Sequence, residues 1–260
     1  MNKDELMFKA RCFFQNFRDG VKVQKNRHLL ELEENGYTVI TDFIDSDKAE
    51  NWALRLNELY NDQNQKYVSV FSNGADLRIF GVDRLSQTFS KFTKNTDLEN
   101  DLSMYVGHPI ETLFTMSGNI SKTSEDSVGS GDGWHRDSFQ IQVKSFLFLD
   151  DVSSENGPLQ VIPKTHKLSS MTNMIKLGLM GWRQHRYDQD VIDKYLSATN
   201  LEAVSLTCKK GTLVLADTRM LHRGAPLKSG SRMALTNYQF MRGRESQKKA
   251  KYFSDVLLVE

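Results

Sequence analysis

Cysteine is scarce in this sequence: Cys12 and Cys208 are the only two among 260 residues. Two cysteines so far apart form neither the disulfide framework of a small secreted domain nor a CxxC motif. The first residues mix acidic and basic side chains and contain no uninterrupted apolar stretch like that of a signal peptide. No stretch approaches the ~20 apolar residues that cross a bilayer. We therefore expect a cytoplasmic protein without a membrane partner.

An excess of charge of either sign is also missing. The chain has 34 Lys and Arg against 33 Asp and Glu, which gives a formal charge of +1. Domains that bind nucleic acids commonly carry a basic stripe, and none is present here. The balance favours a small-molecule partner over a nucleic acid, and it carries no indication of oligomeric state.

Internal repeats are absent, as is any Pro/Gly/Ser-rich linker long enough to separate two domains. We therefore expect one domain over residues 1–260, with a mainly helical part at about 1–108. Apolar periodicity and capping residues indicate helices, and β-branched residues after a turn indicate a strand. The expected elements are a helix within 2–18, a strand at 36–40, a helix from Asp45 or Ser46 to Tyr60, and a helix at 96–106.

Short apolar runs separated by turn residues dominate from residue 110 onward. Such runs are typical of a β-sandwich or barrel, and they define a core at about 109–245. One interruption, at about 168–200, looks helical or looped, and insertions of that length often form a lid or a binding loop. Strands are expected at 109–116, 141–149, 159–162, 203–207, 211–216 and 232–241.

The strongest local signal is Trp134-His135-Arg136-Asp137-Ser138. Residues two apart in extended backbone point to the same side, so His135 and Asp137 can face one point. Two histidines and one carboxylate form an iron site that leaves coordination positions open for a co-substrate and oxygen. A single His-x-Asp is common, however, and a polar pair at a strand end is its ordinary explanation.

A further histidine and an arginine follow downstream. His222 comes after the expected strand at 211–216 and before a Gly-containing turn, a position from which a ligand can point into the mouth of a barrel. Arg232 opens the last strand, and a buried arginine there can bind one end of a dicarboxylate bidentately. Taken singly, His222 is better explained as a capping or core histidine, and Arg232 as a solvated strand-end residue.

The order of these residues resembles the phytanoyl-CoA dioxygenase family of Fe(II)- and 2-oxoglutarate-dependent oxygenases. That family has a His-x-Asp motif, then a distal histidine, then an arginine, and here the last two are ten residues apart. A second stretch supports the resemblance: an apolar strand precedes Asn-Gly-Pro-Leu at 156–159 and Ile-Pro-Lys-Thr-His at 162–166. The family has Gly and Ser where this chain has Lys164 and Thr165, so that turn is expected to differ.

The resemblance implies a fold that is mainly β with added helices, a double-stranded β-helix core, and a defined set of site residues. His135, Asp137 and His222 would bind Fe(II). Arg232 would pair with the C5 carboxylate of 2-oxoglutarate, whose other end chelates the metal. Asn119, on the strand before the His-x-Asp motif, is the candidate for a further contact with 2-oxoglutarate.

The implied reaction consumes O2 and 2-oxoglutarate, releases succinate and CO2, and oxidises a C–H bond of a small-molecule substrate. Relatives that halogenate have Ala or Gly in place of the aspartate, so Asp137 favours hydroxylation. The co-substrate and metal carry the difficult chemistry, so no catalytic residue beyond the metal ligands is expected.

Three side chains are candidates for substrate contact. Arg136 lies beside the metal ligands in the sequence, while Trp182 and Arg183 lie in the insertion, where aromatic and basic residues suit an anionic or sugar-like substrate. The alternative for the insertion is an amphipathic helix with a solvated basic face. The basic run at 242–251 is expected to be a solvated tail.

Two other functions stay open. A non-catalytic cupin-like barrel would keep the strands and bind a ligand without turnover, and a metal-dependent hydrolase would use the same three ligands to activate water. Arg232 separates the hypotheses, because a hydrolase has no need of a buried dicarboxylate site and a non-catalytic barrel is free to lose it.

Overall fold

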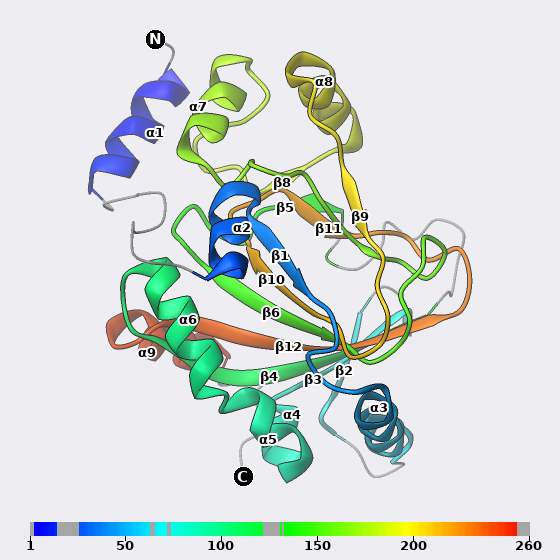
Figure 1. The fold of residues 1–260 in the computed structure, drawn as a ribbon. Coiled ribbons are helices and arrows are strands. Elements are labelled where there is room, and N and C mark those ends of the chain that lie inside the picture. The colour runs from blue at the N-terminus through cyan, green and yellow to red at the C-terminus, as the bar shows by residue number, and fades with distance from the viewer. Residues whose placement is uncertain are drawn as a thin grey trace.

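Two antiparallel β-sheets form the centre of the computed structural model (Figure 1). The larger sheet contains, in spatial order, β1 (Tyr37–Ile40), β10 (Leu213–Asp217), β6 (Val143–Phe148), β12 (Ser231–Met241), β4 (Ile110–Ser121), β3 (Asp76–Phe80) and β2 (Val68–Phe71). The smaller sheet contains β8 (Arg186–Tyr187), β5 (Trp134–His135), β11 (His222–Gly224), β7 (Leu159–Val161) and β9 (Val204–Leu206). The structure describes residues 3–14, 26–62, 66–71, 74–121, 131 and 133–253.

From β4 to β12 the chain passes repeatedly between the two sheets. Strands β4, β6, β10 and β12 lie in the larger sheet, and β5, β7, β9 and β11 lie in the smaller one. Apolar side chains of both sheets pack between them, among them Phe148, Val161 and Val214. This arrangement is a double-stranded β-helix, so the fold class predicted from the sequence is confirmed. Strands β1, β2, β3 and β8 extend the two sheets.

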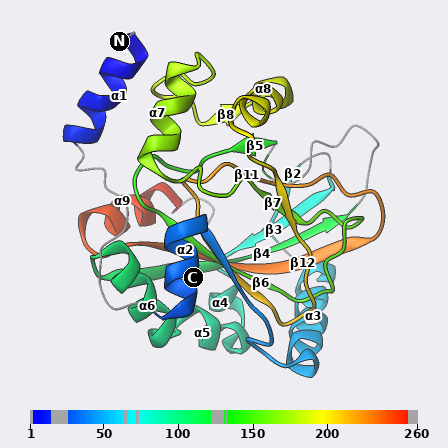
Figure 2. The ribbon, with the colours of Figure 1, turned by 45° about the horizontal axis from the view of Figure 1, so that its top comes forward.

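Helices cover the larger sheet on the side away from the smaller one (Figures 1 and 2). Their buried side chains, such as Trp52 and Leu102, pack against Leu147 and Leu235 of the sheet. Complete burial of one such side chain contributes about 1.5–3 kcal/mol, so this layer fixes the sheet on which half of the site is built. The buried residues of this layer come from α2 (Arg27–Asn35), α3 (Ser46–Asn61), α4 (Val82–Leu85), α5 (Gln87–Thr93) and α6 (Thr96–Val106). The other described helices are α1 (Lys3–Phe14), α7 (Leu168–Lys176), α8 (Gln189–Thr199) and α9 (Arg244–Phe253).

The insertion at 168–200 is built from α7, β8 and α8, not from one amphipathic helix. Its buried residues Met171 and Ile192 form a separate apolar cluster with Phe8 of α1 and Trp134 of β5. Figure 2 shows α1, α7 and α8 together at the end of the molecule beside the smaller sheet. Because β8 pairs with β5, the insertion is joined directly to the strand that carries His135. A lid role for it stays a prediction.

Element boundaries agree with the sequence for the strongest patterns and differ elsewhere. Asp45 caps α3, where its side chain accepts a hydrogen bond from the backbone N–H of Lys48 at 2.7 Å, and α6 ends at Gly107. Strand β4 runs to Ser121, five residues beyond its predicted end, since it pairs with β12 along its whole length. The first helix is described only to Phe14, so the expected residues 15–18 lie outside the described part of the chain.

The basic run at 242–251 is not a solvated tail. It forms most of α9, whose last residue, Phe253, packs on Phe114 and Tyr238 with ring centroids 5.0 and 5.4 Å apart. This aromatic anchor at the end of the run holds the helix against β4 and β12, while Lys248 and Lys251 stay exposed. Among the residues that the structure describes, no helix combines the length and the hydropathy of a membrane-spanning segment.

Candidate metal centre

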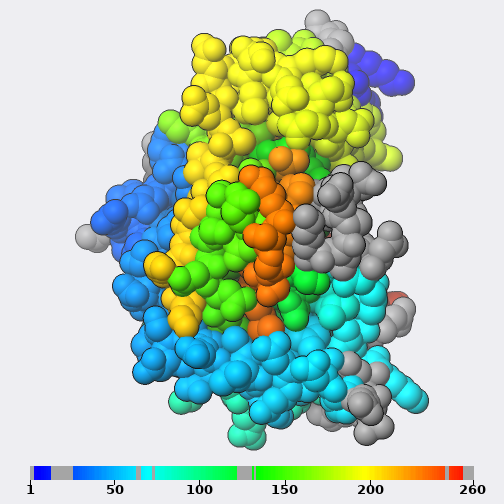
Figure 3. Space-filling view, turned by 90° about the vertical axis from the view of Figure 1, so that its right-hand side faces the viewer, coloured from blue at the N-terminus to red at the C-terminus, as the bar shows by residue number. Residues whose placement is uncertain are grey.

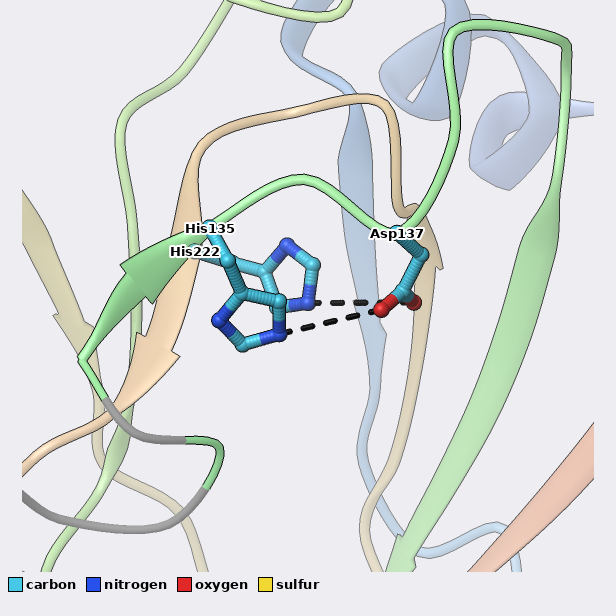
Figure 4. Close-up of side chains that lie close together, drawn as sticks. All are labelled: His135, Asp137 and His222. Atoms are coloured by element: carbon cyan, nitrogen blue, oxygen red, sulfur yellow. Dashed lines mark ion pairs between the residues drawn. The ribbon is translucent and has the colours of Figure 1, made fainter. Parts of the chain in front are cut away.

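The side chains of His135, Asp137 and His222 converge on one point (Figure 4). His135 ends β5 and lies directly opposite His222, the first residue of β11, while Asp137 follows two residues after His135. His135 Nε2 lies 3.7 Å from Asp137 Oδ1, and His222 Nε2 lies 3.9 Å from Asp137 Oδ2. The ligand atoms of all three residues lie within 4.8 Å of one another. The structure therefore brings together the three residues that the sequence singled out.

Backbone carbonyl groups orient both imidazole rings. The carbonyl oxygen of Gly133 lies 2.8 Å from His135 Nδ1, and that of Met220 lies 2.8 Å from His222 Nδ1. A carbonyl can only accept a hydrogen bond, so each Nδ1 carries the proton and each Nε2 keeps its lone pair. Both Nε2 atoms point toward Asp137, which is the orientation that metal binding requires.

Electrostatics at the three residues match the needs of a divalent metal. Burial, reinforced by the nearby His135, lowers the pKa of His222 to about 3, so its ring is neutral at neutral pH. Burial also lowers the pKa of His135. Burial alone would raise the pKa of Asp137, but the Lys144 ammonium 2.8 Å away outweighs it and keeps that carboxyl ionised. Two neutral imidazoles and one carboxylate form a donor set suited to iron.

The chemistry of the three donors supports this fit. Asp137 Oδ2 is buried and forms an ion pair with the Lys144 ammonium at 2.8 Å, which offsets part of the cost of burying the carboxylate. Two imidazole nitrogens and one carboxylate oxygen within 4.8 Å of one another form a donor set for a divalent metal, so the residues present fit a metal ion.

A buried ion pair shapes the turn that leads to His222. Asp217 and Arg219 are both fully buried, with Arg219 Nη2 2.6 Å from Asp217 Oδ2. The same carboxylate accepts hydrogen bonds from the backbone N–H of Arg219 at 3.0 Å and from the hydroxyl of Tyr105 at 2.7 Å. These bonds fix the backbone between the end of β10 and the start of β11, and so they set where His222 begins its strand.

A cavity of about 220 Å³ extends from the three residues between the two sheets. On β12 its wall is formed by the even-numbered residues from Arg232 to Tyr238, and on β6 by Lys144, Phe146 and Phe148. Side chains alternate across a strand, so the odd-numbered residues of β12, such as Met233, face the helices instead. The cavity thus joins the candidate metal ligands to Arg232.

Arg232 is buried beside an apolar wall. Its residue surface is 7% exposed, its guanidinium lies over the Phe148 ring at 5.9 Å, and burial lowers its pKa to about 10. Nη1 donates a hydrogen bond to the carbonyl oxygen of Gly157, while Nε has no hydrogen-bond partner within the described residues. The Asn-Gly turn at 156–157 therefore positions this arginine, and Asn156 adds a bond to the carbonyl oxygen of Ser231 at 3.3 Å.

Comparison with protein-family models shows to which family the chain belongs. The model of the phytanoyl-CoA dioxygenase (PhyH) family matches residues 32–234, more than three quarters of the chain. The chain belongs to the phytanoyl-CoA dioxygenase family. No curated protein matches it in a sequence search. Family membership and the His-Asp-His group together support an oxygenase that uses iron and 2-oxoglutarate.

Solved structures share the fold at low sequence identity. The 2-oxoglutarate-dependent epimerase SnoN from nogalamycin biosynthesis has a TM-score of 0.62 at 14% identity, with 82% of each chain covered. EctD from S. alaskensis, with bound Fe, has a TM-score of 0.62 at 15% identity, covering 86% of this chain and 80% of that one. HygX from Streptomyces hygroscopicus, with nickel and 2-oxoglutarate, has a TM-score of 0.57 at 14% identity, covering 85% and 88%. At these identities the likeness shows the fold alone.

The family's Ile-Pro-Gly-Ser-His turn has a departure in this chain that the structure accommodates. Lys164 has a φ of 67°, in the left-handed region that glycine favours, and its ammonium pairs with Glu34 at 2.9 Å. The hydroxyl of Thr165 donates to the carbonyl oxygen of Ile162 at 2.6 Å and accepts from the backbone N–H of Leu221 at 2.9 Å. The turn is thereby joined to the segment that precedes His222.

Arg136 does not reach the cavity. Its surface is 1% exposed, and its Nη1 donates to the carbonyl oxygens of Thr165 and Arg219. Side chains alternate between the two sides of an extended backbone. Arg136 therefore points away from the side that His135 and Asp137 share. The expected substrate contact is corrected accordingly: Arg136 ties the two turns around His222 together.

Asn119 is likewise on the wrong face for its expected role. In the β4–β12 register it lies opposite Met233, whose side chain belongs to the core beneath the helices. The neighbours Gly118 and Ile120 line the cavity instead. Strand parity therefore turns Asn119 away from the cavity, and the expected contact with 2-oxoglutarate is corrected.

Trp182 and Arg183 lie in the loop between α7 and β8, and neither lines the cavity. The guanidinium of Arg183 stacks on the Trp182 ring at 4.1 Å, and Arg11 donates a hydrogen bond to the Trp182 carbonyl oxygen at 3.2 Å. Trp182 packs on the apolar cluster of α1, α7 and α8. The structure does not bring this pair to the metal centre.

Sequence reasoning missed several residues that do line the cavity. Lys144 is the one charged residue in the mainly apolar run at 143–149, and that isolation was a usable signal. Arg78, Asp76 and Arg186 gave no such signal, because their position depends on how β3 and β8 pair with distant strands.

Proposed function

We propose that this protein is a Fe(II)- and 2-oxoglutarate-dependent dioxygenase that hydroxylates a C–H bond of a small molecule. One observation carries the proposal: a buried arginine, Arg232, shares a cavity with the three candidate ligands and keeps an Nε without a hydrogen-bond partner among the described residues. A buried positive charge is unfavourable unless an anion accompanies it. A dicarboxylate that also binds the metal would place its second carboxylate there.

The roles follow from the contacts. His135, Asp137 and His222 would hold Fe(II), and Arg232 would bind the C5 carboxylate of 2-oxoglutarate bidentately. When bound, this metal and co-substrate supply an oxidant from O2, with release of succinate and CO2. Lys144 keeps the Asp137 carboxylate ionised and close to the two imidazoles.

The walls of the cavity serve to keep water away from the reacting atoms. Phe146, Phe148 and Ala234 present an apolar surface between the metal centre and Arg232. Exclusion of water strengthens the electrostatic contacts within the site and protects a reactive oxidant from side reactions. No side chain in the cavity is needed to transfer a proton in this scheme, which agrees with the neutral state of both histidines.

The rival functions explain less of the cavity. A metal-dependent hydrolase would use the triad but leave the buried Arg232 without a purpose. A non-catalytic barrel would not require ligands held as neutral imidazoles with both Nε2 atoms turned to one carboxylate. Since one structural relative is an epimerase, the fold does not determine which product the oxidation gives. The carboxylate ligand, Asp137, favours hydroxylation over halogenation.

Replacement of Arg232 by methionine is expected to weaken 2-oxoglutarate binding by about 30-fold or more, because loss of one partner of a buried charge pair costs about 2 kcal/mol at the least. Fe(II) binding should change little. The measurement is the rise in thermal midpoint of anaerobic, Fe(II)-loaded protein on titration with 2-oxoglutarate.

Lys228→Gln is the matched control, because it removes a positive charge from the exposed turn just before β12. It should respond to 2-oxoglutarate as the wild type does. If Arg232→Met keeps the full response, Arg232 is not the carboxylate site. If the wild type itself gives no response, the oxygenase proposal fails.

A further inference from the structure

The two candidate histidine ligands are carried by very short strands. Strand β5 contains two residues and β11 contains three, and the register pairs these strands at one position, His135 opposite His222. A ladder of one residue pair leaves the distance between the two ligands weakly determined by backbone hydrogen bonds alone. Contacts between the side chains of these strands and their surroundings therefore matter for the geometry of the centre.

A polar network lies behind this residue pair. Trp134 directly precedes His135 and Arg223 directly follows His222, so in the antiparallel register Trp134 lies opposite Arg223. Side chains alternate along a strand, so both residues project from the face of the smaller sheet opposite to the cavity, and neither lines the cavity. Figure 3 looks onto this face, with the yellow β9, green β7 and orange β11 segments side by side and the α8 region above them.

One side-chain oxygen of the insertion contacts both residues. Oε1 of Gln189, the first residue of α8, accepts hydrogen bonds from Trp134 Nε1 at 3.1 Å and from Arg223 Nη1 at 3.0 Å. The Arg223 guanidinium also lies over the Trp134 ring at 4.7 Å, and its Nε donates to Gln160 Oε1 of β7 at 2.8 Å. We call Trp134, Gln160, Gln189 and Arg223 the rear network. It joins three strands of the smaller sheet to α8.

The orientation of the Gln189 amide follows from its partners. An indole N–H and a guanidinium N–H can only donate, so the amide atom that faces them is the oxygen. The Nε2 atom of the same amide donates to Asp193 Oδ1, further along α8, at 2.8 Å. The reverse orientation would place the amide NH2 against two donors and the oxygen against a carboxylate. Three contacts therefore hold this amide in one orientation, although the residue is exposed.

We propose that Gln189 is a positioning residue of the metal centre. By holding Trp134 and Arg223 together, it sets the distance between the two strands that carry the histidine ligands. The rear network reaches each ligand through its immediate neighbour in the chain, and the insertion thereby forms part of the frame of the centre. This inference rests on the metal centre of the proposed function and is independent of the reaction that the metal supports.

The test compares metal binding by Gln189→Leu with that of the wild type. Leucine keeps most of the side-chain volume but removes the oxygen that both donors share. We expect the affinity for Fe(II) and for Co(II), measured anaerobically by competition with a chelator, to fall by about three- to tenfold, since one typical hydrogen bond corresponds to about fivefold. The visible absorption of bound Co(II) should also change, because it depends on coordination geometry. The thermal midpoint of the metal-free protein should change little, since Gln189 is exposed.

Two further variants separate positioning from a general effect on the helix. Asp190→Leu is the matched control, because Asp190 is exposed on the same turn and pairs with Lys194 of its own helix at 3.1 Å. It should bind both metals as the wild type does. Gln189→Glu/Asp193→Asn exchanges the amide and the carboxylate, which keeps an acceptor for both donors and leaves the total charge unchanged. This double variant should recover the wild-type affinity and Co(II) spectrum.

Three results would overturn the inference. The first is a Gln189→Leu protein that binds Fe(II) within twofold of the wild type and has an unchanged Co(II) spectrum. The second is an equal loss of affinity in Asp190→Leu, which would assign the effect to α8 as a whole. The third is a folded Gln189→Glu/Asp193→Asn protein that recovers nothing. A wild type that binds neither metal is a different failure, because it would remove the candidate centre and with it the proposed function.

Discussion

An Asp137→Ala protein is expected to bind Fe(II) at least about 100-fold more weakly than the wild type, since changes to outer partners of metal ligands alone cost 10–100-fold. The substitution removes the one anionic group of the three and leaves two neutral imidazoles. It also leaves the ammonium of Lys144, which lies 2.8 Å from the carboxylate, as an uncompensated positive charge next to the metal. Anaerobic titration against a chelator of known affinity measures the change.

Asp47→Ala provides the control for loss of an acidic residue, because Asp47 is exposed in the first turn of α3. Its Fe(II) affinity should equal that of the wild type. An Asp137→Ala protein that binds Fe(II) within threefold of the wild type would show that the metal centre lies elsewhere.

Replacing Asp217 with asparagine should lower the free energy of unfolding by about 3–5 kcal/mol, the usual effect of removing one partner from a buried ion pair. Asparagine keeps the shape of the side chain but leaves the charge of the fully buried Arg219 without its counterion. Urea denaturation of the metal-free protein measures the loss. A decrease below 1 kcal/mol would mean that the pair contributes little to the fold.

The double variant Asp217→Leu/Arg219→Met removes both charges and should recover much of this loss, because apolar residues often replace a buried pair at no cost. Acid gives a second test. Burial would raise the pKa of Asp217, but Arg219 outweighs it and lowers that pKa. The contribution is therefore complete above the unfolded carboxyl pKa of about 3.9 and is lost as the pH falls below it. The double variant should lose less stability over that range.

Much of the candidate site was predictable because its candidate ligands belong to local motifs. The His-x-Asp spacing, the position of His222 before a turn, and the start of the last strand at Arg232 are each set by a few consecutive residues. Arg136 was assigned wrongly although the same alternation rule that paired His135 with Asp137 places it on the opposite side. The sequence was therefore sufficient to place Arg136 on the side away from the metal ligands.

Other features depend on pairing between distant strands, which no local pattern reveals. The face of Asn119 follows from the register of β4 with β12, and that register is set more than a hundred residues away. Arg186 reaches the cavity only because β8 pairs with β5, which makes the insertion a part of the smaller sheet. The contact of α9 with β4 and β12 likewise arises from Phe253, beyond the basic run that suggested a tail.

The proposed oxygenase activity is tested most directly by the formation of succinate from 2-oxoglutarate when oxygen is admitted to anaerobic, Fe(II)-loaded protein, beside a His135→Ala control. We expect oxygen-dependent succinate from the wild type, slow without substrate, and none from His135→Ala. Equal succinate from both proteins would contradict it. So would a wild type that forms no succinate and whose iron-loaded form does not bind 2-oxoglutarate.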